Sequence, residues 1–227
     1  MRGRSLIRAG LRSLGAIQGA EIWEVHTDVA AAQISGLASV LSQSESARAA
    51  AYGTEQLRAR YVVRRGTLRL LLANCLDEEP ESVAIREEPG KKPVLVSGRL
   101  HFNLSFSGDL ALFAISAGHE VGIDVERIAP EFPMEATVQD HFTASEQALL
   151  SSAAAADRAA LFFAFWTRKE ACAKALGIGI TDSLAFYETR LPAGAFDSPM
   201  AVCERLQVWD VEVVEGYAGA LAVFESE

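Results

Sequence analysis

The chain has 227 residues and a formal net charge of −9, and half of its residues are apolar. This much apolar material supports a folded core and excludes a disordered protein, while the acidic balance excludes a general nucleic-acid binder, which needs a basic surface. The longest apolar run, Ala159 to Trp166, is too short to cross a bilayer, so we predict a soluble protein without a membrane span. Cys75, Cys172 and Cys203 form no C-x-x-C pair, which predicts reduced thiols in a cytoplasmic protein.

The charge is divided unevenly along the chain. Residues 1–118 contain 14 Lys and Arg against 12 Asp and Glu, whereas residues 119–227 contain 7 against 18. Such a division would suit a site in which one half grips a polyanion and the other half holds a metal ion.

The first 20 residues contain four arginines and no acid. This composition resembles a transit peptide, and it fits a disordered extension or a start assigned too far upstream equally well. We therefore expect residues 1–20 to lie outside the fold, and ordered structure to begin near Ile22, where IWEVHT alternates as a strand does.

Residues 29–76 are rich in Ala, Leu, Arg, Ser and Gln and contain no proline, which predicts two or three helices, the last over about residues 55–76. On that last helix, helical spacing predicts a core face made of Leu57, Tyr61, Leu68 and Leu72. Five arginines are expected on its remaining surface: Arg58, Arg60, Arg64, Arg65 and Arg69. They form either an anion-binding surface or an ordinary solvated helix flank.

The rest of the chain alternates between strand and helix patterns. Residues 83–87 and 121–128 are expected to be strands, and residues 101–108 and 111–116 a hairpin. A helical stretch follows over residues 143–176, with an interruption near residues 151–157. Three further strands are expected over residues 183–191, 204–214 and 217–224. This segregation of helices and strands favours an α+β fold with two sheet-bearing halves of similar size.

The strand GIDVE, residues 122–126, places two acids on one face. Alternation sends Ile123 and Val125 to one side and Asp124 and Glu126 to the other. Two neighbouring carboxylates present the hard oxygen ligands that Mg²⁺ prefers, with substrate phosphates completing its coordination. A half-exposed strand with a polar face would read the same way, so the pair needs a third partner.

The candidate partner is the helix FWTRKEACAK, residues 165–174, where Glu170 and Lys174 share one face. A Glu followed four residues later by Lys also forms an ordinary surface pair. However, an aromatic run leads directly into these charges, and a helix that is apolar on most sides is buried. We therefore expect Lys169, Glu170 and Lys174 to emerge at the rim of a cleft.

The segment NLSFSG, residues 103–108, ends a predicted strand. Its serine hydroxyls and the backbone N–H groups of a glycine turn could hold phosphate oxygens. The simpler interpretation is that these residues occur here only because their backbone preferences suit a turn.

Taken together and in this order, these segments resemble the signature of the Sfp-type 4′-phosphopantetheinyl transferases. The likeness spans about residues 22–224 in element order, and four motifs carry it: GKKP (90–93), FNLSFSG (102–108), GIDVERI (122–128) and WTRKEACAKALG (166–177). Members of this family move the phosphopantetheine arm of coenzyme A onto a serine of an acyl or peptidyl carrier protein and release adenosine 3′,5′-bisphosphate.

The resemblance implies a role for each acid and lysine. Asp124, Glu126 and Glu170 are the implied Mg²⁺ ligands, with Mn²⁺ as an open alternative. Glu170 is also the implied general base for the carrier serine, directly or through a water. Lys174 and Lys92 correspond to lysines on the phosphates of coenzyme A.

Residues of the first half are implied in binding coenzyme A. Arg60 falls where the family places a basic residue for the 3′-phosphate, and Arg64 and Arg65 could share that task. Ser105 matches a phosphate-contacting serine. The family has a histidine after this serine, whereas this chain has Phe106, which cannot donate a hydrogen bond to a phosphate.

The family fold implies a pseudo-dimer of two α+β halves with the site in the seam between them. We assign residues 21–118 to the half that holds the coenzyme A phosphates and residues 119–227 to the metal side. The implied partner is a carrier protein, and we expect a monomer that binds neither nucleic acid nor membrane.

Two alternatives stay open. One is a non-catalytic homologue that binds coenzyme A or a carrier protein, which Phe106 motivates. The other is a different Mg²⁺-dependent phosphoryl-transfer enzyme that uses the same three acids.

Overall fold

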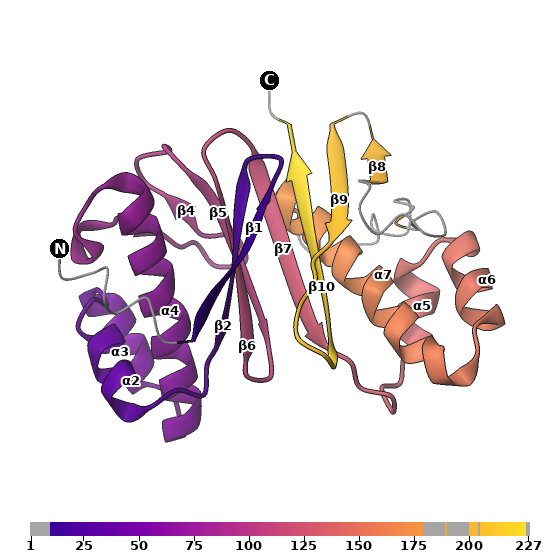
Figure 1. The fold of residues 1–227 in the computed structure, drawn as a ribbon, viewed down its shortest axis with the longest axis horizontal. Coiled ribbons are helices and arrows are strands. Elements are labelled where there is room, and N and C mark those ends of the chain that lie inside the picture. The colour runs from indigo at the N-terminus through magenta and orange to yellow at the C-terminus, as the bar shows by residue number, and fades with distance from the viewer. Residues whose placement is uncertain (1–9, 179–188, 190–199, 204, 226–227) are drawn as a thin grey trace.

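The computed structural model describes residues 10–178, 189, 200–203 and 205–225. In this part of the chain, two antiparallel four-stranded sheets pack face to face, and helices cover the outer face of each sheet (Figure 1). The predicted α+β class is confirmed. None of the described helices is both long and apolar enough to span a bilayer.

The first sheet has the strand order β1-β2-β6-β5. Its strands are β1 (Leu11–Ile17), β2 (Ala20–His26), β5 (His101–Ser107) and β6 (Leu110–Ser116). β5 and β6 form the predicted hairpin, with Ser107 opposite Leu110. The small strands β3 (Ile85–Arg86) and β4 (Val94–Leu95) pair separately, so only two residues of the strand expected over 83–87 are extended in a ladder.

The expectation that order begins near Ile22 is wrong. β1 lies within the segment that we assigned to a disordered extension, and it pairs with β2 from Leu11 opposite Val25 to Ile17 opposite Ala20. Gln18 and Gly19 form the turn with positive φ angles. Cross-strand pairing and packing of Leu14 and Ile17 against the core between the sheets outweigh the basic composition of the segment.

Three helices cover the outer face of the first sheet: α2 (Ala31–Ala38), α3 (Gln43–Ala50) and α4 (Glu55–Leu76). The Thr54 hydroxyl caps α4 by accepting a hydrogen bond from the Leu57 amide, and Asp77 ends the helix in the left-handed conformation. A short 3₁₀ turn, Pro80–Ser82, follows.

The expected core face of α4 is partly right. Tyr61, Leu68 and Leu72 are buried, but Leu57 is 48% exposed because it lies in the first turn of the helix. Arg65 and Arg69 were expected on the surface, and both are buried instead. The buried carboxylate of Glu45 on α3 pairs with both guanidinium groups, and this attraction offsets the desolvation cost of burying them.

The second sheet has the order β7-β10-β9-β8. Its strands are β7 (Glu120–Arg127), β8 (Met200–Cys203), β9 (Leu206–Asp210) and β10 (Tyr217–Phe224). The long helix α7 (Ala155–Leu176) packs on its outer face, beside α5 (Glu135–His141) and α6 (Ala144–Ser152). Gly177 terminates α7 with a φ of 68°. The strand expected over 183–191 lies outside the described residues, apart from Thr189.

A common apolar core joins the two sheets. It is built mainly from inward-facing residues of β2, β6, β7, β9 and β10, including Ile22, Leu112, Ile123, Trp209 and Leu221. The predicted boundary between residues 118 and 119 falls in the turn between β6 and β7. The division into two halves related by symmetry stays a prediction.

Candidate active site

The candidate site lies where an edge strand of each sheet meets the other. β5 of the first sheet contacts β7 of the second. The Asn103 side-chain oxygen accepts a hydrogen bond from the Ile123 amide at 2.9 Å, and the Ser107 hydroxyl accepts one from the Arg127 amide at 3.1 Å. Residue numbers rise together on the two strands, so side chains of β5 at every second position bridge two strands that run in the same direction.

Asp124 is the most enclosed acid of the site, with 2% of its surface exposed. Its Oδ1 atom accepts a hydrogen bond from the Ser105 hydroxyl at 2.6 Å and pairs with the Lys174 ammonium at 2.6 Å. Its Oδ2 atom is buried and has no hydrogen-bond partner among the described residues. A buried carboxylate oxygen without a partner is costly, and an additional positive group at this oxygen would remove the cost.

Lys174 links three segments that are distant in the sequence. From the last turn of α7, its Nζ atom donates to Asp124 on β7, to the Ser105 hydroxyl on β5 at 3.1 Å and to the Ile123 carbonyl at 3.2 Å. The predicted convergence of these segments is therefore present in the fold. Its side chain remains 28% exposed, so the ammonium is within reach of a ligand that arrives from solvent.

Glu126 and Glu170 belong to the same electrostatic neighbourhood. Glu126 accepts a hydrogen bond from the Ser107 hydroxyl at 2.7 Å, but burial and the charge of Asp124 still raise its pKa. Burial and the charge of Asp124 also raise the pKa of Glu170, to about 7; Lys174 opposes this rise, and Glu126 adds to it. The negative charges of the three acids therefore repel one another, and the single positive charge of Lys174 offsets this repulsion only in part.

The metal centre expected from these acids is not formed in the described residues, where no group of three His, Cys, Asp or Glu side chains could hold a metal ion as they stand. The ammonium of Lys174 neutralises Asp124 in this arrangement. The donor set nevertheless fits a hard divalent cation, because it offers the unpartnered Oδ2 of Asp124 and two carboxylates whose pKa values are raised mainly by burial and further by the charge of Asp124.

The other predicted phosphate ligands lie apart from this cluster. Lys92 donates to the Glu120 carboxylate at 2.8 Å and to the Val121 carbonyl at 2.6 Å, at the beginning of β7. Burial lowers the pKa of Lys92, against the effect of Glu120. Arg60, on α4, forms two hydrogen bonds with the Asp28 carboxylate at 3.1 and 3.2 Å. Hydrogen bonds join three of the seven predicted residues, Ser105, Asp124 and Lys174. Glu126 and Glu170 interact electrostatically with Asp124, and Lys92 and Arg60 lie in separate ion pairs.

Two features of the site were missed in the sequence. Ser107 orients Glu126 as Ser105 orients Asp124, and the two-residue period of β5 was the available signal. Gly122 has no room for a side chain, since a Cβ atom would lie 2.0 Å from the Ala171 carbonyl oxygen. A glycine inside a strand often marks such a close approach of another backbone.

The chain was compared with known proteins. Residues 120–222 match the sequence model of the 4′-phosphopantetheinyl transferase superfamily. The chain is 36% identical to the 4′-phosphopantetheinyl transferase HetI of Nostoc sp. over 163 residues, which cover 70% of this chain and 69% of that protein. It is 34% identical to a putative 4′-phosphopantetheinyl transferase of Synechocystis sp. over 72% of this chain and 67% of that protein. It is also 34% identical to the 4′-phosphopantetheinyl transferase AcpT of Salmonella typhimurium, over 55% of this chain and 64% of that protein. Both the site and these likenesses lead to one conclusion: the chain belongs to the 4′-phosphopantetheinyl transferase superfamily of enzymes.

Proposed function

We propose that this protein transfers the 4′-phosphopantetheine group of coenzyme A to a serine of an acyl or peptidyl carrier protein. The observation that carries the proposal is the junction of Ser105, Asp124 and Lys174, in which the two sheets and α7 meet at one cationic and acidic site. Family membership and this junction support the same chemistry, because phosphoryl transfer requires opposite charges held at fixed positions around the reacting group.

The reaction exchanges one P–O bond for another. The hydroxyl oxygen of the carrier serine attacks the phosphorus that bears the pantetheine arm, and the bond from this phosphorus to the bridging pyrophosphate oxygen breaks. The leaving group is adenosine 3′,5′-bisphosphate, which takes the bridging oxygen and its electron pair. The serine proton passes to the carboxylate of Glu170, directly or through a water.

Each charged side chain has a separate task in this proposal. Lys174, with its donor group at the β5–β7 seam, would bind and orient the pyrophosphate oxygens. Ser105 holds Asp124 in place through its short hydrogen bond and could donate to a phosphate when a ligand is bound. Lys92 would reach a phosphate only after leaving Glu120, so its assignment as a phosphate ligand rests on the family resemblance.

The proposed metal ligands are Asp124, Glu126 and Glu170. Their fit to a divalent cation rests on the unpartnered Asp124 oxygen and on the mutual repulsion of the three carboxylates. Mg²⁺ bound here would supply positive charge to phosphate oxygens as the pyrophosphate bond breaks. Mn²⁺ takes the same kind of ligands and is expected to substitute for it.

The direct test uses apo carrier proteins, coenzyme A and Mg²⁺, with the carrier analysed by mass spectrometry. The proposal predicts a mass gain of one phosphopantetheine group, together with release of adenosine 3′,5′-bisphosphate only when a carrier is present. An unchanged mass across fatty acid, polyketide and peptide carriers, with coenzyme A still bound, would favour the non-catalytic homologue. Release of the nucleotide without a carrier would favour a different phosphoryl-transfer reaction.

The proposed setting of this reaction is a monomer in the cytoplasm. Cys75 is a free thiol, which agrees with a reducing compartment. Size-exclusion chromatography with light scattering tests the oligomeric state, and the panel of carriers identifies the pathway that the enzyme serves.

A further inference from the structure

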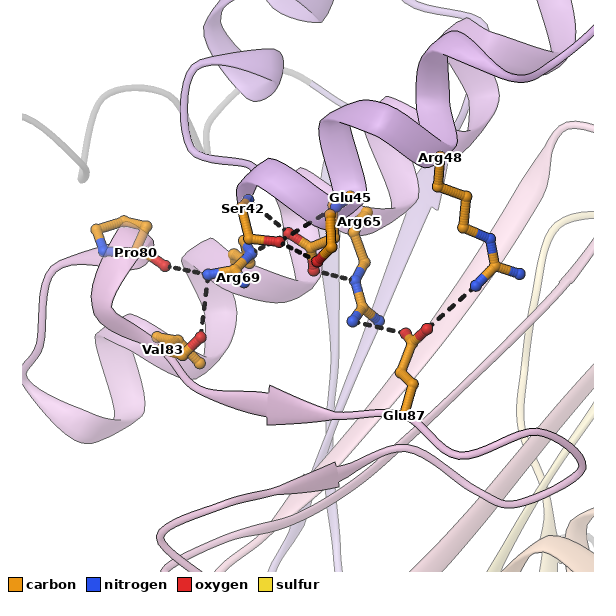
Figure 2. A network of polar contacts seen from close by, with 9 residues as sticks. Ser42, Glu45, Arg48, Arg65, Arg69, Pro80, Val83 and Glu87 are labelled. Carbon is orange, nitrogen blue, oxygen red and sulfur yellow. Dashed lines mark hydrogen bonds and ion pairs between the residues drawn. The ribbon is translucent and has the colours of Figure 1, made fainter.

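The arginines of α4 differ in how their charge is balanced. Arg65 and Arg69 both pair with the buried carboxylate of Glu45, and Arg65 also pairs with Glu87 at 2.6 Å (Figure 2). Figure 2 shows Arg69 turned toward the backbone carbonyls of Pro80 and Val83, which are at 2.8 and 3.1 Å. These two guanidinium groups hold α3, α4 and the following loop together, and buried or partly buried carboxylates already balance their charge.

Arg60 is also neutralised within the protein. Its Nε and Nη2 atoms make a two-point contact with Asp28, which balances the charge of the guanidinium. A phosphate at Arg60 would therefore meet a cation that already has a counter-ion. The residue that the family resemblance implies for the 3′-phosphate is therefore poorly prepared for that task in this chain.

Arg64 is the exception. It forms no ion pair with a carboxylate anywhere in the described part of the chain, and its guanidinium carbon lies 3.5 Å from the centre of the Phe106 ring. Burial is the main cause that lowers the pKa of Arg64. A half-buried guanidinium without a carboxylate partner is an incomplete site for an anion.

Phe106 supplies a platform for this guanidinium. On β5 it lies between Ser105 and Ser107, and alternation along the strand turns it away from the carboxylates and toward α4. The ring is 49% exposed, so a ligand that arrives from solvent can reach it. Stacking of an arginine on a ring face fixes its plane and leaves the N–H groups at its edge available to an anion.

We propose that Arg64, held over the ring of Phe106, binds the 3′-phosphate of coenzyme A. The inference rests on the proposed function. Coenzyme A carries a pyrophosphate, which must reach Asp124 and Lys174, and a third phosphate on the ribose, which is remote from the reacting bond. Arg64 lies over Phe106, which follows Ser105 in the sequence and faces the opposite side of β5. A cation in this place suits the remote phosphate. Phe106 thus replaces the histidine of the family indirectly, because its ring positions the guanidinium of Arg64, which can donate hydrogen bonds.

The decisive experiment compares coenzyme A with 3′-dephospho-coenzyme A as donors for the wild-type protein and for Arg64→Ala. Because hydrogen bonds between charged groups are strong, we expect Arg64→Ala to raise the KM for coenzyme A on the order of 10- to 100-fold and to leave the KM for the dephospho form nearly unchanged. Arg58→Ala is the matched control, since Arg58 is exposed on the same helix and loses the same charge. It should change neither value by more than about twofold.

The ring is tested by Phe106→Leu, which keeps an apolar side chain but removes the stacking surface. It should weaken the preference for coenzyme A over the dephospho form in the wild-type background and have no further effect on that preference in Arg64→Ala. In Phe106→His, a donor replaces the platform, so the preference for the 3′-phosphate should persist.

Three results would overturn the inference while leaving the proposed function intact. One is an equal loss with both donors in Arg64→Ala. Another is a rise in the KM for the carrier alone, which would assign Arg64 to an acidic surface of the carrier. The third is additivity of the Phe106→Leu and Arg64→Ala effects. If the wild-type protein transferred nothing from either donor, the proposed function itself would fail.

In that case, calorimetric titration with adenosine 3′,5′-bisphosphate and with AMP tests Arg64 without turnover. Equal affinities of the wild-type protein for the two nucleotides would overturn the inference.

Discussion

Replacing Gly122 with alanine tests whether the contact between β7 and α7 sets the geometry of the site. A Cβ atom at residue 122 would lie 2.0 Å from the carbonyl oxygen of Ala171 and 2.4 Å from the backbone nitrogen of Ala175. Favourable contacts of heavy atoms begin near about 3.5 Å, so the strand and the helix would have to separate by roughly 1.5 Å. Backbone atoms cannot rotate away as a side chain does, so α7 itself must move.

The displaced helix carries Glu170 and Lys174 with it. The Lys174 ammonium now lies 2.6 Å from Asp124, and a shift of this size would break that contact. Overpacking of a core typically costs about 1–3 kcal/mol, and a misplacement of about 1 Å in an active site can cost roughly 100-fold in rate. For Gly122→Ala we therefore expect a loss of about 2–3 kcal/mol in the free energy of unfolding and a rate of transfer lower by about 100-fold.

Urea unfolding followed by far-UV circular dichroism measures the first effect, and the initial rate of carrier modification measures the second. Gly118→Ala is the control, because a Cβ atom at that residue meets nothing within 4 Å. Wild-type stability together with a wild-type rate in Gly122→Ala would refute the reasoning, since it would mean that the helix does not lie in backbone contact with the strand.

Three other substitutions test separate parts of the structure. Glu170→Gln removes the proposed base without changing shape, so transfer should fall below detection by carrier mass while the urea midpoint stays within error; near wild-type turnover would reject the assignment of the base. Glu45→Gln leaves Arg65 and Arg69 buried beside a neutral group, which should cost about 3 kcal/mol in urea unfolding. Burial opposes ionisation of Glu45, but hydrogen bonds from Arg69, the Ser42 amide and Arg65 lower its pKa overall. Its contribution to stability is therefore present above the ordinary glutamate pKa of 4.5 and is lost as the pH falls through the lower pKa of the folded state. The wild-type protein should therefore lose more stability than Glu45→Gln on acidification, and parallel pH profiles of the two proteins would contradict this. Lys169→Met leaves the fully buried carboxylate of Glu146 without its ion-pair partner and should lower the free energy of unfolding by about 3–5 kcal/mol. Adding Glu146→Gln should restore part of this loss in the double variant. An unchanged urea midpoint in the single variant would show that the pair adds nothing to stability.

Local patterns were sufficient to predict most of the elements. Alternation predicted the β5–β6 hairpin and the strand that carries Asp124 and Glu126, and helical periodicity predicted α4 and α7. These patterns reflect interactions between residues that are close in the sequence, such as the capping of α4 by Thr54 and the positive φ of Gly177 at the end of α7. The motifs of β7 and α7 also predicted that Lys174 would lie near Asp124, and the two side chains pair at 2.6 Å.

Other outcomes depended on contacts between distant segments. The basic composition of residues 1–20 predicted no strand, but β1 forms because β2 offers it a partner and the core between the sheets accepts its apolar side chains. Arg64 and Arg65 are adjacent in the sequence and chemically identical, yet one stacks on an exposed ring and the other is buried against Glu45. The sequence by itself determined which side chains could carry charge and where strands and helices would form. Only the tertiary structure decided which charges are neutralised, because the screening and desolvation of a charge depend on what packs against it.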